Sequence, residues 1–62
     1  MTRFKGQFCW HGQSFTLYRY AKTIAHAKSV MIRSIANEVH VEPYYVNLYF
    51  VGKDNYNIKE VS

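Results

Sequence analysis

The chain is poor in the residue types from which catalytic sites are built. It contains one cysteine and four acidic residues in 62 positions. General acid–base and nucleophilic catalysis both need at least two reactive groups held together. Asp54 stands alone in an expected turn, every glutamate lies beyond residue 37, and no glycine-rich phosphate loop is present. We therefore expect no enzymatic activity and no cofactor.

The single cysteine, Cys9, excludes an intramolecular disulfide, and in so small a protein this favours a reducing, intracellular setting. Cys9 and His11 are two residues apart, which suggests metal binding. A structural zinc site usually needs four ligands, however, and only His26 and His40 remain as candidates. We predict that no metal is bound and that Cys9 is a buried or partly buried structural residue.

Long apolar runs are missing as well, so we expect neither a signal peptide nor a membrane span. We predict a cytoplasmic protein that makes no membrane contact. The length of 62 residues fits one domain, covering 1–62, and a chain of this size buries only about 60% of its unfolded surface. This leaves no room for a buried substrate cavity. Aromatic residues, 18% of the chain, compensate by burying a large area each.

Acidic residues are absent from the first 37 positions. That part of the chain carries six positive charges, whereas residues 38–62 carry two lysines against four acids, a balance of −2. One part of the surface should therefore be strongly positive, which favours an anionic partner. The alternative is that the net charge of +4 serves only solubility.

Residues 4–10 and 15–20 alternate between apolar and polar side chains, which is typical of half-buried strands. The intervening residues 11–14, with Gly12 free to adopt positive φ, supply a turn. The sequence predicts a hairpin.

From Thr23 to about Val39 the apolar residues recur at spacings of three and four, which indicates one amphipathic helix. Thr23 is placed to cap its N-terminus, and Pro43 requires the helix to end before Glu42. We expect the face that packs on the sheet to consist of Ile24, Ala27, Met31 and Ile35, with Lys28 at its edge.

Residues 44–51 are rich in aromatic and β-branched side chains and predict a third strand. Residues 52–55 predict a turn, and 56–61 a short edge strand. The expected fold class is α+β with the order β-β-α-β-β: a four-stranded, mainly antiparallel sheet with one helix on one face. The alternation assigns these side chains to the covered face: Phe4, Phe8, Phe15, Leu17, Val46, Leu48, Phe50 and Ile58.

Two surfaces are candidates for partner binding. The first is a ridge on the predicted helix, opposite its apolar stripe, formed by Lys22, His26, Ser29 and Arg33. A solvated helix face is usually charged, but it normally mixes both signs, and this ridge contains no acid. It would suit phosphates or an acidic protein surface.

The second candidate is the uncovered sheet face, where alternation places four tyrosines, Tyr18, Tyr20, Tyr45 and Tyr49, together with Thr16, Asn47 and Val51. Exposed aromatic patches usually have a role. These rings would stack on unpaired bases or form a protein interface, including a homodimer. A shifted register would instead bury some of them. Because Arg19 points to the other face by parity and no other cation is certain to lie among the rings, we favour the protein interface slightly.

The segment from Phe15 to Ala36 has the pattern Phe-x5-Ala followed by a helix with Ala27-Lys28 and Ile35-Ala36. It resembles certain small phage-encoded anti-CRISPR proteins. That resemblance implies a compact domain that occupies the guide-RNA or DNA-binding surface of a CRISPR complex. The succession Phe4-x-Gly6, Ser14-Phe15-Thr16 and Val46-x-Leu48 is similar in outline to the ribosomal large-subunit LX family, which implies binding to rRNA.

Together these features predict a non-enzymatic, anti-CRISPR-like inhibitor that binds a host protein or nucleoprotein complex and blocks it. The alternative is a module that binds RNA or DNA directly, including a ribosome-associated one. Salt dependence separates the two, because direct neutralisation of phosphates gives affinity that falls steeply with salt.

Overall fold

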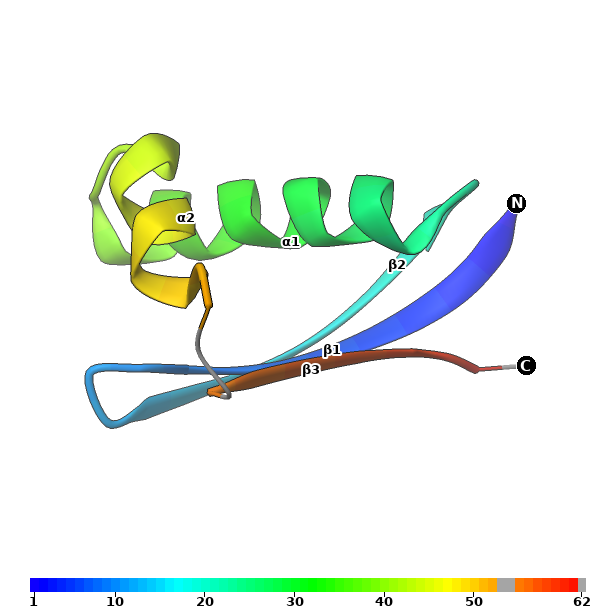
Figure 1. Cartoon of the computed structure of the whole chain (residues 1–62), viewed down its shortest axis with the longest axis horizontal. Helices are drawn as coiled ribbons and strands as arrows, with labels where there is room; N and C mark the ends of the chain where they lie inside the picture. The colour runs from blue at the N-terminus through cyan, green and yellow to red at the C-terminus, as the bar shows by residue number, and fades with distance from the viewer. Residues whose placement is uncertain (53–54, 62) are drawn as a thin grey trace.

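In the computed structural model, which describes residues 1–52 and 55–61, two helices lie over one face of an antiparallel sheet (Figure 1). The α+β class is confirmed. The expected four strands and single helix are wrong, since the described residues form three strands and two helices. The elements are β1 (Thr2–Trp10), β2 (Gln13–Ala21), α1 (Ile24–Val39), α2 (Pro43–Phe50) and β3 (Tyr56–Glu60).

The first strand of the chain is the central strand of the sheet, whose order is β2-β1-β3. Strands β1 and β2 form the predicted hairpin, with Trp10 opposite Gln13. Only His11 and Gly12 separate them, with φ of 47° and 83°. Positive φ at both central residues is the type I′ geometry that matches the twist of a two-residue hairpin. Strand β3 pairs with the other side of β1, and it is an edge strand as predicted.

Helix α1 follows the sequence prediction closely. The Thr23 side-chain oxygen accepts a hydrogen bond from the backbone N–H of His26 at 3.1 Å, which caps the N-terminus. At the other end His40 adopts a left-handed conformation, with φ of 59°, and its N–H donates to the Ala36 carbonyl. Lys28 is half-buried, and its ammonium lies over the Tyr56 ring at 4.7 Å from the centroid.

The buried residues of α1 include Ala27, Met31 and Ile35, as expected, and also Ile32 and Ala36. Ile24 was expected in this set, but its side chain is 52% exposed. Ile24 lies on the same side of the helix as Ala27, Met31 and Ile35, but in the first turn. Burial of a helical residue depends on what packs opposite it as well as on the side of the helix that carries it.

The segment predicted as a third strand is helix α2. Pro43 occupies the first helical turn, where its fixed φ and missing N–H are favourable. Val46 and Phe50, four residues apart, are fully buried, whereas Leu48 between them is 48% exposed. Alternation would have buried all three, so the spacing that operates here is helical. The predicted turn after this segment includes Lys53 and Asp54, which lie outside the described residues.

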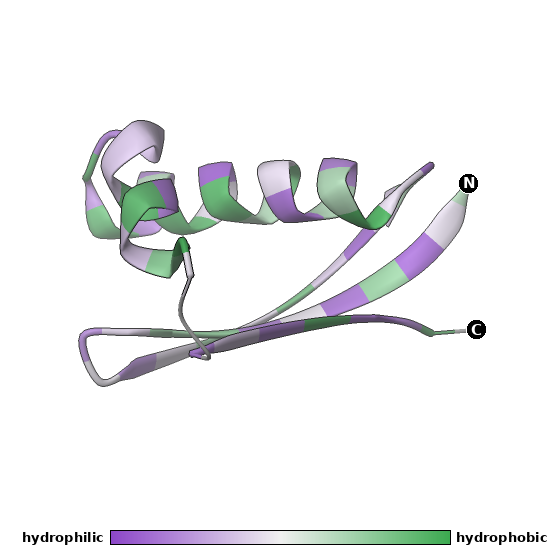
Figure 2. Cartoon of the chain, in the orientation of Figure 1, coloured by the Kyte–Doolittle hydropathy of each residue, from purple (hydrophilic) through white to green (hydrophobic). Residues whose placement is uncertain are grey.

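Aromatic rings dominate the core between sheet and helices. Phe8 on β1 meets Phe50 of α2 edge to face at 5.2 Å and stacks on Tyr56 of β3 at 5.6 Å. Hydrophobic and hydrophilic residues alternate along the strands (Figure 2), so that one side of the sheet faces this core. The core residues are Phe4, Phe8, Ala21, Ala27, Met31, Ile32, Ile35, Ala36, Val46 and Phe50. Phe15, Leu17 and Ile58 pack against them half-buried.

Candidate nucleic-acid interface

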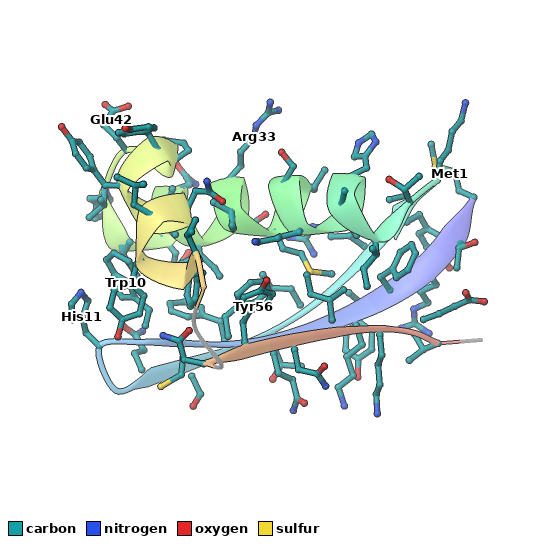
Figure 3. All side chains as sticks on the ribbon, in the orientation of Figure 1. Met1, Trp10, His11, Arg33, Glu42 and Tyr56 are labelled. Carbon is teal, nitrogen blue, oxygen red and sulfur yellow. The ribbon has the colours of Figure 1, made fainter. Side chains whose placement is uncertain are left out.

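The face of the sheet turned away from the helices is uncovered, and we call it the open face. Phe4, Gly6 and Phe8 of β1 are buried toward the helices, so the intervening side chains project the other way. Figure 3 shows a row of side chains below the sheet, with Tyr56 pointing up into the core. By strand register, the open face carries Arg3, Lys5, Gln7, Cys9, Ser14, Thr16, Tyr18, Tyr20, Asn57 and Lys59.

One half of the open face combines cations with tyrosines, and we call it the basic–aromatic half. Arg3 pairs across the strands with Tyr20, and Lys5 pairs with both Tyr18 and Lys59. The guanidinium carbon of Arg3 lies 4.6 Å from the centroid of the Tyr18 ring, and the Lys5 ammonium lies 5.9 Å from it. Tyr18 is 43% and Tyr20 66% exposed. Flat π surfaces and positive charges therefore share one exposed area.

The positive charge of this half has no acidic counterpart on the same face of the described structure. Glu38 lies on α1 and Glu42 precedes α2, while Glu60 has the strand parity of Ile58, which faces the helices. Lys5 and Lys59 are direct cross-strand neighbours, and like charges in that position destabilise a sheet. An anion bound between them would relieve this repulsion.

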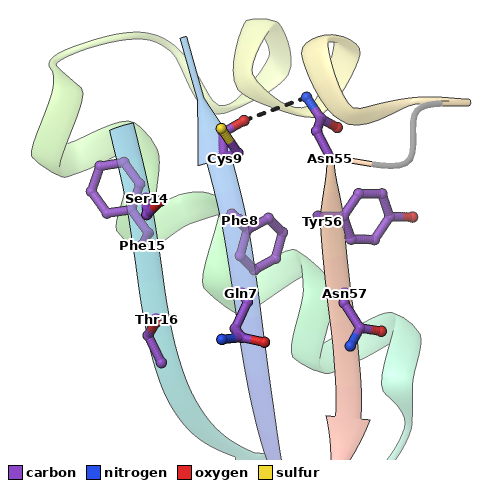
Figure 4. A pocket seen from close by; sticks show the side chains of 9 residues that line it. All are labelled: Gln7, Phe8, Cys9, Ser14, Phe15, Thr16, Asn55, Tyr56 and Asn57. Carbon is purple, nitrogen blue, oxygen red and sulfur yellow. Dashed lines mark hydrogen bonds between the residues drawn. The ribbon is translucent and has the colours of Figure 1, made fainter. Parts of the chain in front are cut away.

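The other half of the open face is uncharged, and we call it the polar half. It forms a shallow hollow of about 340 Å³ near the hairpin turn (Figure 4). Thr16, Gln7 and Asn57 form a row across the three strands. Asn55 closes the end of the hollow, and its side-chain amide donates to the Cys9 carbonyl at 3.4 Å. The lining residues are Gln7, Phe8, Cys9, Ser14, Phe15, Thr16, Asn55, Tyr56 and Asn57.

Of the four tyrosines predicted for this face, the structure places Tyr18 and Tyr20 there. The prediction is wrong for Tyr45 and Tyr49, because both belong to α2. Tyr45 is 59% exposed on that helix. Tyr49 is half-buried against Trp10 at 4.8 Å, and its hydroxyl accepts a hydrogen bond from the His11 backbone N–H at 3.3 Å. Asn47 and Val51 were also expected on the sheet, but Asn47 belongs to α2 and Val51 follows it directly.

The predicted ridge exists, but it lies away from the tyrosines of the sheet. Lys22, His26, Ser29 and Arg33 are all exposed, as expected. Arg33 points away from the sheet on the far side of α1 (Figure 3). The structure therefore separates the two candidate surfaces instead of joining them into one site.

The sequence interpretation missed the cations of the open face, although part of the signal was present. With a two-residue turn after Trp10, strand pairing places Arg3 opposite Tyr20 and Lys5 opposite Tyr18. Lys59 could not be placed without the strand order. Arg19 does point to the other face, as expected, where its guanidinium donates to the Ser34 hydroxyl at 3.0 Å and to the Tyr18 carbonyl at 2.7 Å.

Within the described part of the chain, no group of three or more His, Cys, Asp or Glu side chains is arranged to hold a metal ion. None of its helices has the length and apolar character needed to cross a bilayer. Comparison of the chain with protein-family models, with curated proteins and with solved structures found no match. The resemblances to anti-CRISPR and ribosomal proteins therefore stay predictions.

Proposed function

We propose that this protein binds single-stranded nucleic acid on its open face, without catalysis. The observation that carries the proposal is the placement of Arg3, Lys5 and Lys59 around the exposed rings of Tyr18 and Tyr20. The sequence alone could not place any cation with certainty among the tyrosines, and this arrangement supplies three.

The chemistry follows from the two side-chain types. Exposed aromatic rings and arginine guanidinium planes stack on unpaired bases, and each stacked base contributes about 1–3 kcal/mol. Lysine ammonium groups neutralise the adjacent phosphates. Bases paired inside a duplex are not available for stacking on a flat sheet, so the preferred ligand is an unpaired strand.

Titration of a fluorescent single strand of about 10 nucleotides, followed by anisotropy at several salt concentrations, tests this proposal. Three cations that each neutralise a phosphate predict a slope of about −2 for log affinity against log salt. A Lys5→Ala/Lys59→Ala variant should reduce the slope to about −0.7 and weaken binding at low salt.

The matched control is Lys22→Ala/Arg33→Ala, which removes the same charge from the helix ridge. It should bind nearly as tightly as the wild type, because its lower net charge causes only a small loss of long-range electrostatic attraction. If the control loses binding while the sheet variant retains it, or if no strand binds at low salt, the open face is not the binding surface.

We propose as a second candidate that the chain binds the protein part of a host nucleoprotein complex, as an anti-CRISPR-like inhibitor would. The observation that favours it is a cluster of exposed apolar and aromatic side chains on and just after α2: Tyr44, Tyr45, Leu48 and Val51. Aromatic residues are enriched at such interfaces. Capture of a complex that survives nuclease treatment and is lost with Leu48→Ser supports this candidate, whereas loss on nuclease treatment supports direct nucleic-acid binding.

A further inference from the structure

We propose that the polar half of the open face reads the base next to the one stacked on Tyr18, and that it prefers adenine. The inference rests on the proposed binding of a single strand. It assigns different tasks to the two halves, with affinity from the basic–aromatic half and base preference from the polar half.

The first support is the unused hydrogen-bonding capacity of the row Thr16, Gln7 and Asn57. These three side chains are exposed, and none of them takes part in a hydrogen bond with another described residue. Each amide has an acceptor oxygen and a two-proton donor nitrogen, and the threonine hydroxyl is both donor and acceptor. The row therefore presents donors and acceptors side by side across the three strands.

The second support is the shape of the face. Large side chains stand on the basic–aromatic half, whereas Cys9, Ser14 and Thr16 in the polar half are small, which leaves the hollow of about 340 Å³. This volume is at the lower end of the range of roughly 300–1,000 Å³ found for small-molecule sites. Thr16 precedes Tyr18 by two positions along β2, about 7 Å in a strand. The neighbour of a nucleotide stacked on Tyr18 is therefore within reach of the hollow.

The choice of adenine follows from which side chains line the hollow. On the base edges that a duplex exposes in its major groove, and that an unpaired strand exposes as well, arginine and lysine are the common partners of guanine, aspartate and glutamate accept from cytosine, and asparagine and glutamine pair with adenine through two hydrogen bonds. The hollow contains no charged side chain, but it contains the amides of Gln7, Asn55 and Asn57. The Asn55 amide nitrogen donates to the Cys9 carbonyl, whereas the amides of Gln7 and Asn57 form no hydrogen bond with another described residue.

The test compares a uridine strand with the same strand carrying one central adenosine, by anisotropy titration. The adenosine strand should bind the wild type about tenfold more tightly. In a Gln7→Ala/Asn57→Ala variant this preference should disappear, because the affinity for the adenosine strand falls toward the affinity for the plain uridine strand. Asn37→Ala, which removes an exposed amide from α1, is the control and should keep the preference.

The outcomes separate this inference from the proposed function. If no strand binds, the proposed function fails. If strands bind without preference, or if the preference survives in the double variant, the polar half does not read a base. The matching deoxy strands form a second arm. A preference of similar size there supports reading of the base edge, whereas loss of the preference in deoxy strands shows that it depends on the sugar conformation or contacts and overturns the inference. Thermal melting by circular dichroism checks that the variants fold.

Discussion

The two faces of the sheet use aromatic side chains in different ways. On the covered face Phe8 packs against other rings, Phe50 edge to face and Tyr56 stacked, and water is excluded. On the open face Tyr18 lies among cations and remains 43% exposed. In a domain this small, one sheet therefore carries the core on one face and the proposed binding surface on the other. Changes on the covered face should therefore affect folding, and changes on the open face should affect binding.

The largest effect is expected for Phe8→Ala on the covered face. Truncation of a buried phenylalanine costs about 3–5 kcal/mol. A domain of this size has a total stability on the order of 3–9 kcal/mol, so the variant should lose half or more of its stability and unfold at a much lower urea concentration than the wild type. Phe8→Leu keeps more of the side-chain volume and should unfold at a urea concentration between those of Phe8→Ala and the wild type. A Phe8→Ala protein that unfolds at the wild-type urea concentration would show that this face does not carry the core.

A smaller effect is expected for Gly6→Ala, where the covered face is most tightly packed. A Cβ at this position would clash with the sulfur of Met31 and come within 2.8 Å of the Phe8 ring. Overpacking of this kind costs about 1–3 kcal/mol, which should appear as a lower urea midpoint. Gln7→Ala, on the open face next to it, is the matched control, with an expected change within about 0.5 kcal/mol. Equal midpoints for the two variants would contradict the assignment of faces.

The smallest effect on stability is expected for Tyr18→Ser/Tyr20→Ser, because both rings lie on the open face. We expect a change of less than about 1 kcal/mol in the free energy of unfolding. Binding of a single strand should weaken by about 1–3 kcal/mol for each base that loses its stacking partner. Urea unfolding and anisotropy on the same preparations measure the two quantities. A variant that loses stability but binds a single strand as tightly as the wild type would show that these tyrosines support the fold and not binding.

How far the sequence predicted the structure depended on how local each signal was. The hairpin and α1 follow from local features: the His11-Gly12 turn, the Thr23 cap and the spacing of Met31 and Ile35. These features agree with one another, so each element is specified by several consistent signals.

The segment that became α2 shows why the rest could not be predicted in the same way. Its aromatic and β-branched residues have high strand propensity, but that propensity reflects packing context more than an intrinsic backbone preference. The opposing signals were Pro43 at a helix start and the four-residue spacing of Val46 and Phe50. In a segment of eight residues, either interpretation fits the apolar pattern, and packing on Phe8 decided between them.

The same limit applied to the candidate site. Tyr18 and Tyr20 were placed correctly because hairpin parity is local, whereas Lys59 joined them through a pairing between distant parts of the chain. Tyr45 and Tyr49 were misplaced because their strand was misassigned.

The central position of β1 also bears on how the chain reaches its native state. Its partner on one side, β2, follows after two residues, but its partner on the other side ends at Glu60, which pairs with Phe4 from the far end of the chain. Such pairings between residues distant in sequence raise the contact order and slow folding, because a long loop must close first. Until β3 pairs with it, β1 exposes one edge of unpaired backbone groups, a template for aggregation. Pairing of β3 with β1 therefore also removes an exposed strand edge.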